Sequence, residues 1–191
     1  MKKIRPISII IIIFSLALFG SYHIYYYCID KINNNLVDNY LKEEVVLNNE
    51  EKTISKKISD SKEEYLGILE ISKINLKLGF YNINSKQNNV NKNVSLLKGS
   101  VMPNIKGSTI YLAAHSGNSY LGYFKNLKKL NINDELIINY RGVKYKYIIN
   151  NIYNLDKNGY IEVNKNKSDN YLVLTTCNND KQLVITSKLI K

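Results

Sequence analysis

Cysteine and histidine are scarce in this chain of 191 residues, and their scarcity limits the chemistry open to it. Cys28 and Cys177 lie far apart in sequence, so they do not form the disulfide framework of a small secreted domain. His23 and His115 are also distant and the acidic residues are scattered, so we expect no metal site. Cys28 lies at the end of the apolar N-terminal segment, so Cys177 supplies the one thiol outside that segment.

Acidic residues are also few. The chain has 16 acidic and 27 basic residues and a formal net charge of +11. The lysines are spread over the whole sequence without a dominant basic run, and no nucleic-acid-binding motif is present. This pattern argues against nucleic acid as a partner. It predicts a solvated basic surface, attracted at most to anionic lipid headgroups or cell-wall polymer.

The N-terminal segment has the pattern of a membrane-spanning helix. Lys2, Lys3 and Arg5 precede an uncharged run from Ile7 to Cys28, and roughly 20 apolar residues are enough to cross a bilayer. Tyrosines near its end are typical of a membrane interface, and the basic residues predict a cytoplasmic N-terminus. The alternative is a cleaved signal peptide, but bulky tyrosines occupy the region of the expected cleavage site. We therefore expect residues 1–28 to be a cytoplasmic tip and an uncleaved anchor.

Residues 29–64 differ in composition from the segments on either side. They are rich in Asn, Lys, Glu and Ser, and apolar residues at helical spacing are found mainly at 36–41. This composition fits either a partly helical stalk or a disordered linker. Both forms would join the anchor to an extracellular folded domain at 65–191.

The folded domain contains many short apolar segments, most of them with the alternation of strands. These segments are 66–74, 76–80, 108–114, 135–140, 143–152, 171–176 and 182–190. Arg141-Gly142 has the character of a hairpin turn, and the spacing of Leu121, Phe124, Leu127 and Leu130 predicts a short helix. Because strands and helices do not alternate, we expect a mostly antiparallel β-barrel or sandwich.

His115 and Cys177 occupy matching positions, because each directly follows an apolar strand. If the two strands are neighbours, both side chains emerge at one rim, where an imidazole can generate the thiolate that a nucleophile requires. The alternative is a core strand that ends in an inert thiol, together with a hydrogen-bonded surface histidine. The pattern alone leaves both interpretations open.

Several segments, taken in order, resemble the sortases, the membrane-anchored cysteine transpeptidases of Gram-positive bacteria. Leu174-Thr-Thr-Cys177 resembles the TLxTC motif of that family, with Val173 in place of the first Thr. Thr109 to Gly117 resembles the strand that leads into the catalytic histidine. Three further segments, at 67–74, 123–137 and 182–189, are similar to the opening strand, the "F..L..L..GD.I" segment and the closing strand. The resemblance covers residues 65–191.

This resemblance implies an eight-stranded β-barrel with short helices and a transpeptidase without a cofactor. Cys177 would attack an LPxTG-like sorting signal and form a thioester, and His115 would protonate the leaving amine and deprotonate the incoming one. Thr176, with Ala114 and Ser116, would contact the substrate. The expected partners are surface proteins that carry sorting signals, and a cell-wall precursor or pilin that supplies the acceptor amine.

One position departs from the family pattern. Sortases carry a catalytic Arg at the start of the closing strand, where this chain has Gln182. Glutamine keeps hydrogen-bond donors but lacks the charge and the bidentate geometry of a guanidinium group. The adjacent Lys181 is a possible substitute cation. The chain is therefore expected to be a slow enzyme, an enzyme rewired through Lys181, or an inactive relative.

Other cysteine hydrolases fit less well. A caspase-like enzyme requires a QACxG-type motif and alternating helices and strands, which this sequence lacks. A chymotrypsin-like cysteine protease usually has Gly around its nucleophile, whereas Asn178 and Asn179 follow Cys177. The non-enzymatic alternative is a sortase-fold module that binds sorting signals or pilins without turnover.

Overall fold

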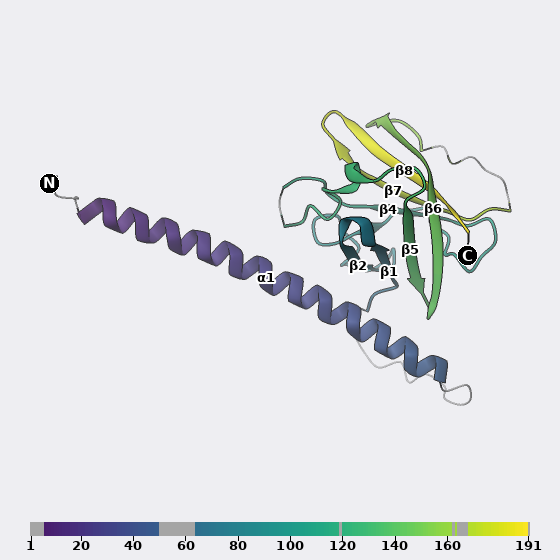
Figure 1. The fold of residues 1–191 in the computed structure, drawn as a ribbon, viewed down its shortest axis with the longest axis horizontal. Coiled ribbons are helices and arrows are strands. Elements are labelled where there is room, and N and C mark those ends of the chain that lie inside the picture. Colours follow the sequence, from purple (N-terminus) through teal and green to yellow (C-terminus); the bar gives the residue numbers. More distant parts are fainter. Residues whose placement is uncertain (1–5, 50–63, 119, 162, 164–167, 191) are drawn as a thin grey trace. The chain divides into compact units, whose positions relative to one another are not determined.

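The structure is a computed structural model that describes residues 6–49, 64–118, 120–161, 163 and 168–190 (Figure 1). The chain divides between Asn35 and Leu36 into two compact units. The first unit contains most of helix α1, and the second contains the end of this helix and all eight strands. Of the predicted stalk, residues 50–63 lie outside the described residues.

Helix α1 runs from Pro6 to Asn49 without interruption. Its stretch from Ile9 to Lys42 is long and apolar enough to cross a membrane, and large apolar side chains such as Ile10 and Phe14 are exposed on it. These properties are compatible with the predicted membrane anchor. Because the helix continues well past residue 28, the expected anchor and the first part of the stalk form one helix.

The end of this helix packs within the second unit. Val37 is only 2% exposed and belongs to an apolar cluster with Tyr65, Ile68 and Tyr81. The Tyr40 hydroxyl donates to the carbonyl oxygen of Leu66 at 3.3 Å and accepts from a backbone N–H of the hairpin turn at the same distance. This part of the helix is therefore held by both apolar packing and hydrogen bonds.

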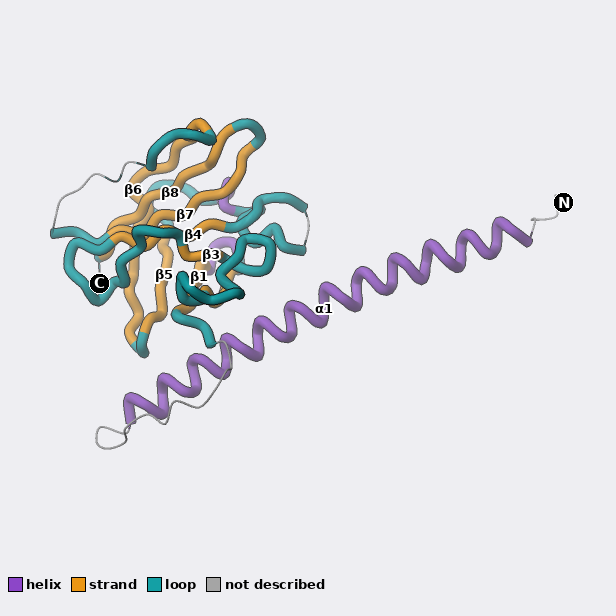
Figure 2. Tube along the Cα trace, turned by 180° about the vertical axis from the view of Figure 1, so that it is seen from behind, coloured by secondary structure: helices purple, strands orange, loops and turns teal. Residues whose placement is uncertain are grey.

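The eight strands form one sheet in the order β2-β1-β5-β6-β8-β7-β4-β3. All neighbours are antiparallel except β4 and β7, which are parallel. A bridge between Phe80 and Val94 links the two ends of this order, so the sheet is nearly closed. Figure 2 shows β6, β8, β7, β4 and β3 following one another across the molecule. The strands are β1 (Gly67–Ile71), β2 (Leu76–Phe80), β3 (Ser95–Leu96), β4 (Thr109–Ala113), β5 (Glu135–Tyr140), β6 (Val143–Asp156), β7 (Tyr171–Asn178) and β8 (Lys181–Leu189). The predicted mostly-β, eight-stranded barrel is confirmed.

Side chains on the two faces of this sheet belong to different apolar clusters. Leu172 and Leu174 point into the main core, together with Leu112 and Ile185 of the neighbouring strands. The alternate residues Tyr171, Val173 and Val184 form a second cluster on the outer face, with Val163 packed against them. A strand buried on both faces explains the continuous apolar run at 171–174, which has no alternation of its own.

Two tight turns fix the registers of the β5/β6 and β7/β8 strand pairs. In the predicted hairpin between β5 and β6, Arg141 and Gly142 have φ of +51° and +73°, as a type I′ turn requires. Asn179, with φ of +54°, turns the chain between Asn178 and Lys181, which face each other in β7 and β8. Asparagine tolerates this left-handed conformation better than most residues. The turn after Cys177 is therefore short and sets the position of the first residues of β8.

The predicted helix at 121–130 is wrong. This segment is a series of turns that ends in a 3₁₀-helix at Leu127–Lys129. Phe124, Leu127 and Leu130 are nevertheless buried in the main core. Their spacing of three residues matches a 3₁₀ turn as well as one face of an α-helix, so the burial pattern did not separate the two.

Candidate active site

The parallel pairing of β4 with β7 brings His115 and Cys177 to the same edge of the barrel. The register pairs Ala113 with Thr175, and each candidate residue comes two positions later on its own strand. Ala114 lies in the main core, so the alternation puts His115 on the outer face. Cys177 follows Thr175 on that same face. The register therefore brings the two predicted residues to the same end of neighbouring strands.

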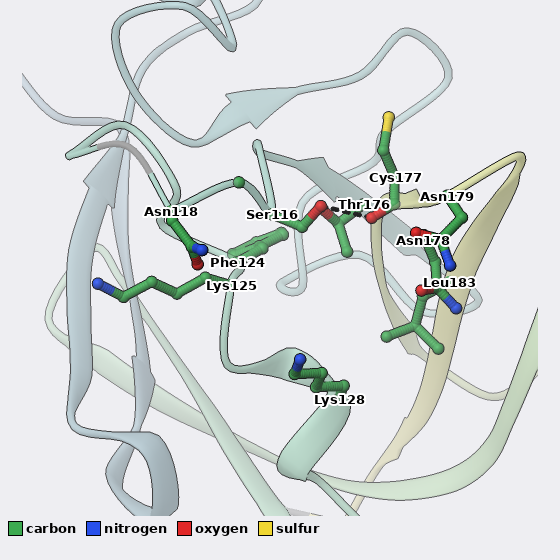
Figure 3. A pocket seen from close by; sticks show the side chains of 11 residues that line it. Ser116, Asn118, Phe124, Lys125, Lys128, Thr176, Cys177, Asn178, Asn179 and Leu183 are labelled. Atoms are coloured by element: carbon green, nitrogen blue, oxygen red, sulfur yellow. Dashed lines mark hydrogen bonds between the residues drawn. The ribbon is translucent and has the colours of Figure 1, made fainter.

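Cys177 is the last residue but one of β7, and its thiol is free and exposed. The backbone carbonyl of Cys177 accepts a hydrogen bond from the hydroxyl of Ser116, the residue after His115 (Figure 3). This bond ties the segment after β4 to the end of β7. Ser116 thus joins the two chain segments that carry the candidate nucleophile and the candidate base.

His115 has one hydrogen-bond partner that the sequence did not indicate. Its Nε2 lies 2.9 Å from Oδ1 of Asn91, in the loop between β2 and β3. An amide oxygen only accepts hydrogen bonds, so Nε2 carries the proton in this arrangement and Nδ1 is left available. Asn91 lies in a loop rich in asparagine, and no pattern there distinguishes it from its neighbours.

Gln182 is the residue of β8 that faces Cys177 across the β7/β8 pair. Directly paired residues project from the same face of a sheet, so the Gln182 side chain lies on the outer face with the thiol. Its Nε2 donates one hydrogen bond, to the carbonyl oxygen of Lys157 at 3.1 Å. The amide group carries a second N–H.

Lys181 occupies the opposite face of β8. It faces Asn178 in β7 and Asp156 in β6, and its Nζ lies 3.6 Å from Oδ1 of Asp156. The ammonium group and the Cys177 thiol thus project from different faces of the sheet. Gln182 and Lys181 are both predicted to lie near the thiol. The register places the Gln182 side chain on the same face as the thiol and the Lys181 side chain on the opposite face.

Thr176 and Ala114 are buried on the inner side of the barrel. Thr176 is 6% exposed, and its Oγ1 donates to the carbonyl oxygen of Ala114 at 2.7 Å. Thr175 lies on the outer face beside the thiol and is also buried, but its Oγ1 has no hydrogen-bond partner among the described residues. The two threonines of the motif therefore have different surroundings, and sequence reasoning had singled out only Thr176.

A pocket of about 290 Å³ opens beside Cys177 (Figure 3). Its lining includes the predicted residues Ser116 and Thr176, and two lysines that sequence reasoning missed, Lys125 and Lys128. The full lining is Ser116, Gly117, Asn118, Phe124, Lys125, Lys128, Thr176, Cys177, Asn178, Asn179 and Leu183. In the part of the chain that the structure describes, no three His, Cys, Asp or Glu side chains are grouped as metal ligands.

Comparison with known proteins gives one consistent family. The model of the sortase domain matches residues 69–190. No match was found among curated proteins. Sortase C1 from Streptococcus suis is 26% identical, with a TM-score of 0.61 over 68% of this chain and 74% of that one. Sortase A from Corynebacterium diphtheriae, a lid mutant, is 18% identical with a TM-score of 0.62, over 83% and 95% of the two chains. The sortase D5 transpeptidase of Clostridium perfringens is 19% identical with a TM-score of 0.61, over 85% and 98%.

Proposed function

Because this chain belongs to the sortase family, we propose that it is a transpeptidase whose nucleophile is the thiol of Cys177. The observation that carries this proposal is the parallel register of β4 and β7, from which His115 and Cys177 follow at one rim and on one face. A cysteine nucleophile needs a nearby base, and His115 is the candidate that this register supplies.

The reaction would transfer an acyl group in two steps. In the first, the Cys177 thiolate bonds to the carbonyl carbon of the Thr in an LPxTG-like signal. The C–N bond breaks, and the leaving amine takes a proton from His115. In the second, an acceptor amine bonds to the thioester carbon and gives its proton to His115, and the thiolate leaves. Asn91 would hold the imidazole through Nε2, so that Nδ1 exchanges the proton.

Gln182 is the side chain best suited to the role of the usual Arg. It lies on the outer face opposite Cys177, and one N–H of its amide remains beyond the bond to the Lys157 carbonyl. An amide donor without a charge stabilises an oxyanion less than a guanidinium does, so the enzyme should be slow. Lys181 is the weaker alternative because it lies on the other face, beside Asp156.

The outer face of β4 and β7 beside the thiol is largely covered by the chain itself, because Val173 and Thr175 are buried there. Tyr111 and Val173 face each other there, and Ala113 faces Thr175 one step closer to the thiol. A sorting signal would therefore reach only the half-buried side chains of this row, Tyr111 and Ala113, on its way to the thiol.

Helix α1 supports attachment to a cell membrane as a single-pass protein. Under the positive-inside rule, Lys2, Lys3 and Arg5 would keep the N-terminus in the cytoplasm and leave the catalytic domain, residues 65–191, outside. Residues 1–28 would then act as the tip and anchor and residues 29–64 as the stalk. The partners would be surface proteins with sorting signals, and a cell-wall precursor or pilin that supplies the amine.

A second candidate function is a binding module that holds sorting signals without turnover, and Gln182 at the usual Arg position favours it. The test uses the full chain in detergent micelles, a panel of sorting-signal peptides and amine acceptors, and mass spectrometry of the products. Amide exchange that disappears in Cys177→Ala and persists in the matched Cys28→Ala variant supports the transpeptidase. Acceptor-independent hydrolysis indicates a cysteine protease, and binding without thioester or product indicates the module.

A further inference from the structure

The pocket beside Cys177 is positively charged. Lys125 and Lys128 line it, and no acidic side chain is among its lining residues. Neither lysine takes part in an ion pair within the described residues. The remaining polar lining consists of hydroxyl and amide groups, including those of Asn118, Asn178 and Asn179. Such a concave, cationic surface attracts anions.

This pocket and the outer-face residues Val173 and Thr175 lie on different sides of Cys177. The pocket is lined by inner-face residues of the barrel, among them Thr176 and Leu183, which face each other in β7 and β8. The outer face of β7 continues instead from Cys177 to the buried residues Thr175 and Val173. In Figure 3 the sulfur of Cys177 points away from the other lining side chains, at the rim of the pocket.

A transpeptidase has to bring two substrates to one sulfur. An LPxTG-like segment is uncharged apart from its variable position, so the cationic pocket is better matched to the second substrate. We propose that this pocket binds the acceptor through an anionic group, a carboxylate or a phosphate, that the acceptor carries close to its reacting amine. Lys125 and Lys128 would pair with that group, and the asparagine side chains would supply further hydrogen bonds. This inference rests on the proposed function.

Binding of the anion beside Cys177 would hold the acceptor amine next to the thioester. The amine nitrogen then bonds to the thioester carbonyl carbon, the C–S bond breaks, and the amine proton passes to His115. The Cys177 sulfur returns as thiolate, so the step needs no further reactant. Acceptors without the anionic group would react through the same chemistry but from a less populated complex.

The test compares two matched pairs of acceptors on the full chain in detergent micelles, at fixed pH and low salt. Glycylglycine is compared with glycylglycine amide, and phosphoethanolamine with ethanolamine. We expect kcat/KM for the anionic member of at least one pair to exceed that of the neutral member by about fivefold or more. The pair with the larger preference identifies the source as carboxylate or phosphate. The preference should disappear in the double variant Lys125→Gln/Lys128→Gln and persist in Lys129→Gln, a neighbouring lysine outside the pocket lining.

Two readouts separate the failure of this inference from the failure of the proposed function. Thioester formation at Cys177 is measured without acceptor, and binding of each acceptor is measured by saturation-transfer NMR on the resting protein. Equal kcat/KM within both pairs, or a preference unchanged in the double variant, overturns the acceptor site even if the thioester forms. If no thioester forms, binding of the four amines that does not depend on their charge overturns the acceptor site. Binding that requires the anionic group and is lost in the double variant supports the acceptor site.

Discussion

The two faces of β7 share one backbone, but their side chains have different roles. The even-numbered residues Leu172, Leu174 and Thr176 point inward, where they fill the core or are hydrogen-bonded to it. The odd-numbered residues Thr175 and Cys177 point outward and lead to the exposed thiol. A strand whose inner face is locked in this way holds the side chains of its outer face in fixed positions. The comparison shows how a core strand becomes the support of a nucleophile.

The largest effect should come from the inner face. Leu174 is fully buried, so Leu174→Ala should lower the free energy of unfolding by about 3 kcal/mol through lost transfer energy and the cavity that remains. Cys177→Ala removes an exposed side chain and should change it by less than about 0.5 kcal/mol. Urea unfolding followed by tyrosine fluorescence measures both. Equal decreases in the free energy of unfolding of the two variants would contradict the different roles of the two faces.

The second effect concerns the two residues that begin β8, which project from opposite faces. Gln182→Arg restores a charged, bidentate donor opposite Cys177 and should raise the transpeptidation rate by about 100-fold. Lys181→Arg keeps its charge on the other face and should leave the rate within about twofold of the parent. The measurement is kcat/KM for one sorting peptide with one acceptor. A gain from Lys181→Arg instead would mean that the ammonium side supplies the cation.

A smaller contrast separates the two threonines of the motif. Thr176→Val removes a buried hydrogen bond to the Ala114 carbonyl and should destabilise the fold by about 1–3 kcal/mol. Thr175→Val replaces a buried hydroxyl that has no partner among the described residues, so its stability should be unchanged or slightly higher. Thermal unfolding of both variants in the same buffer provides the check. The distinction between inner and outer face is lost if Thr175→Val is the more damaging change.

The smallest effect lies at the far end of the outer face, where Lys188 faces Tyr171. Its ammonium group donates to Asp169, with Nζ 2.7 Å from a carboxylate oxygen, and this hydrogen bond raises the pKa of Lys188 above its ordinary value. The raised pKa makes the stabilisation complete below the pKa of the unfolded chain, about 10.4, and removes it as the pH rises through the folded value. Comparison of Tm between the parent and Lys188→Met should therefore show a small gap at neutral pH that closes above pH 10. A gap unchanged at high pH, or one equally present in Lys98→Met, would argue against this.

Much of the architecture could be predicted from the sequence because it depends on residue patterns within short segments. Apolar strands bounded by turns predicted a mostly antiparallel barrel or sandwich, and Arg141-Gly142 predicted its hairpin; the family resemblance supplied the eight-stranded barrel. From the sequence, His115 and Cys177 come to one rim only if their two strands are neighbours, which the pattern alone left open and the order of the family motifs favoured; β4 and β7 are paired in the structure. The segment at 121–130 was misjudged because an i, i+3 apolar spacing does not separate an α-helix from successive tight turns.

Other parts of the site depend on contacts between distant segments. Asn91 reaches His115 from a loop with no periodic pattern, and the lysines of the pocket are two among many along the chain. The register of β7 against β8 decides that Gln182, and not Lys181, lies on the side of the thiol. A register shift of one residue would place Lys181 on the side of the thiol and Gln182 on the opposite side. The sequence around the turn at Asn179 does not determine this register by itself.

The most direct test of the account is the covalent state of Cys177 during reaction. The full chain in detergent micelles is mixed with a sorting-signal peptide without acceptor, quenched in acid, and analysed by intact mass and peptide mapping. The account predicts an acyl adduct on the peptide that contains Cys177, present in Cys28→Ala, absent in Cys177→Ala and discharged by an added amine. An adduct on Cys28, or none with any peptide of the panel while those peptides bind, would contradict it.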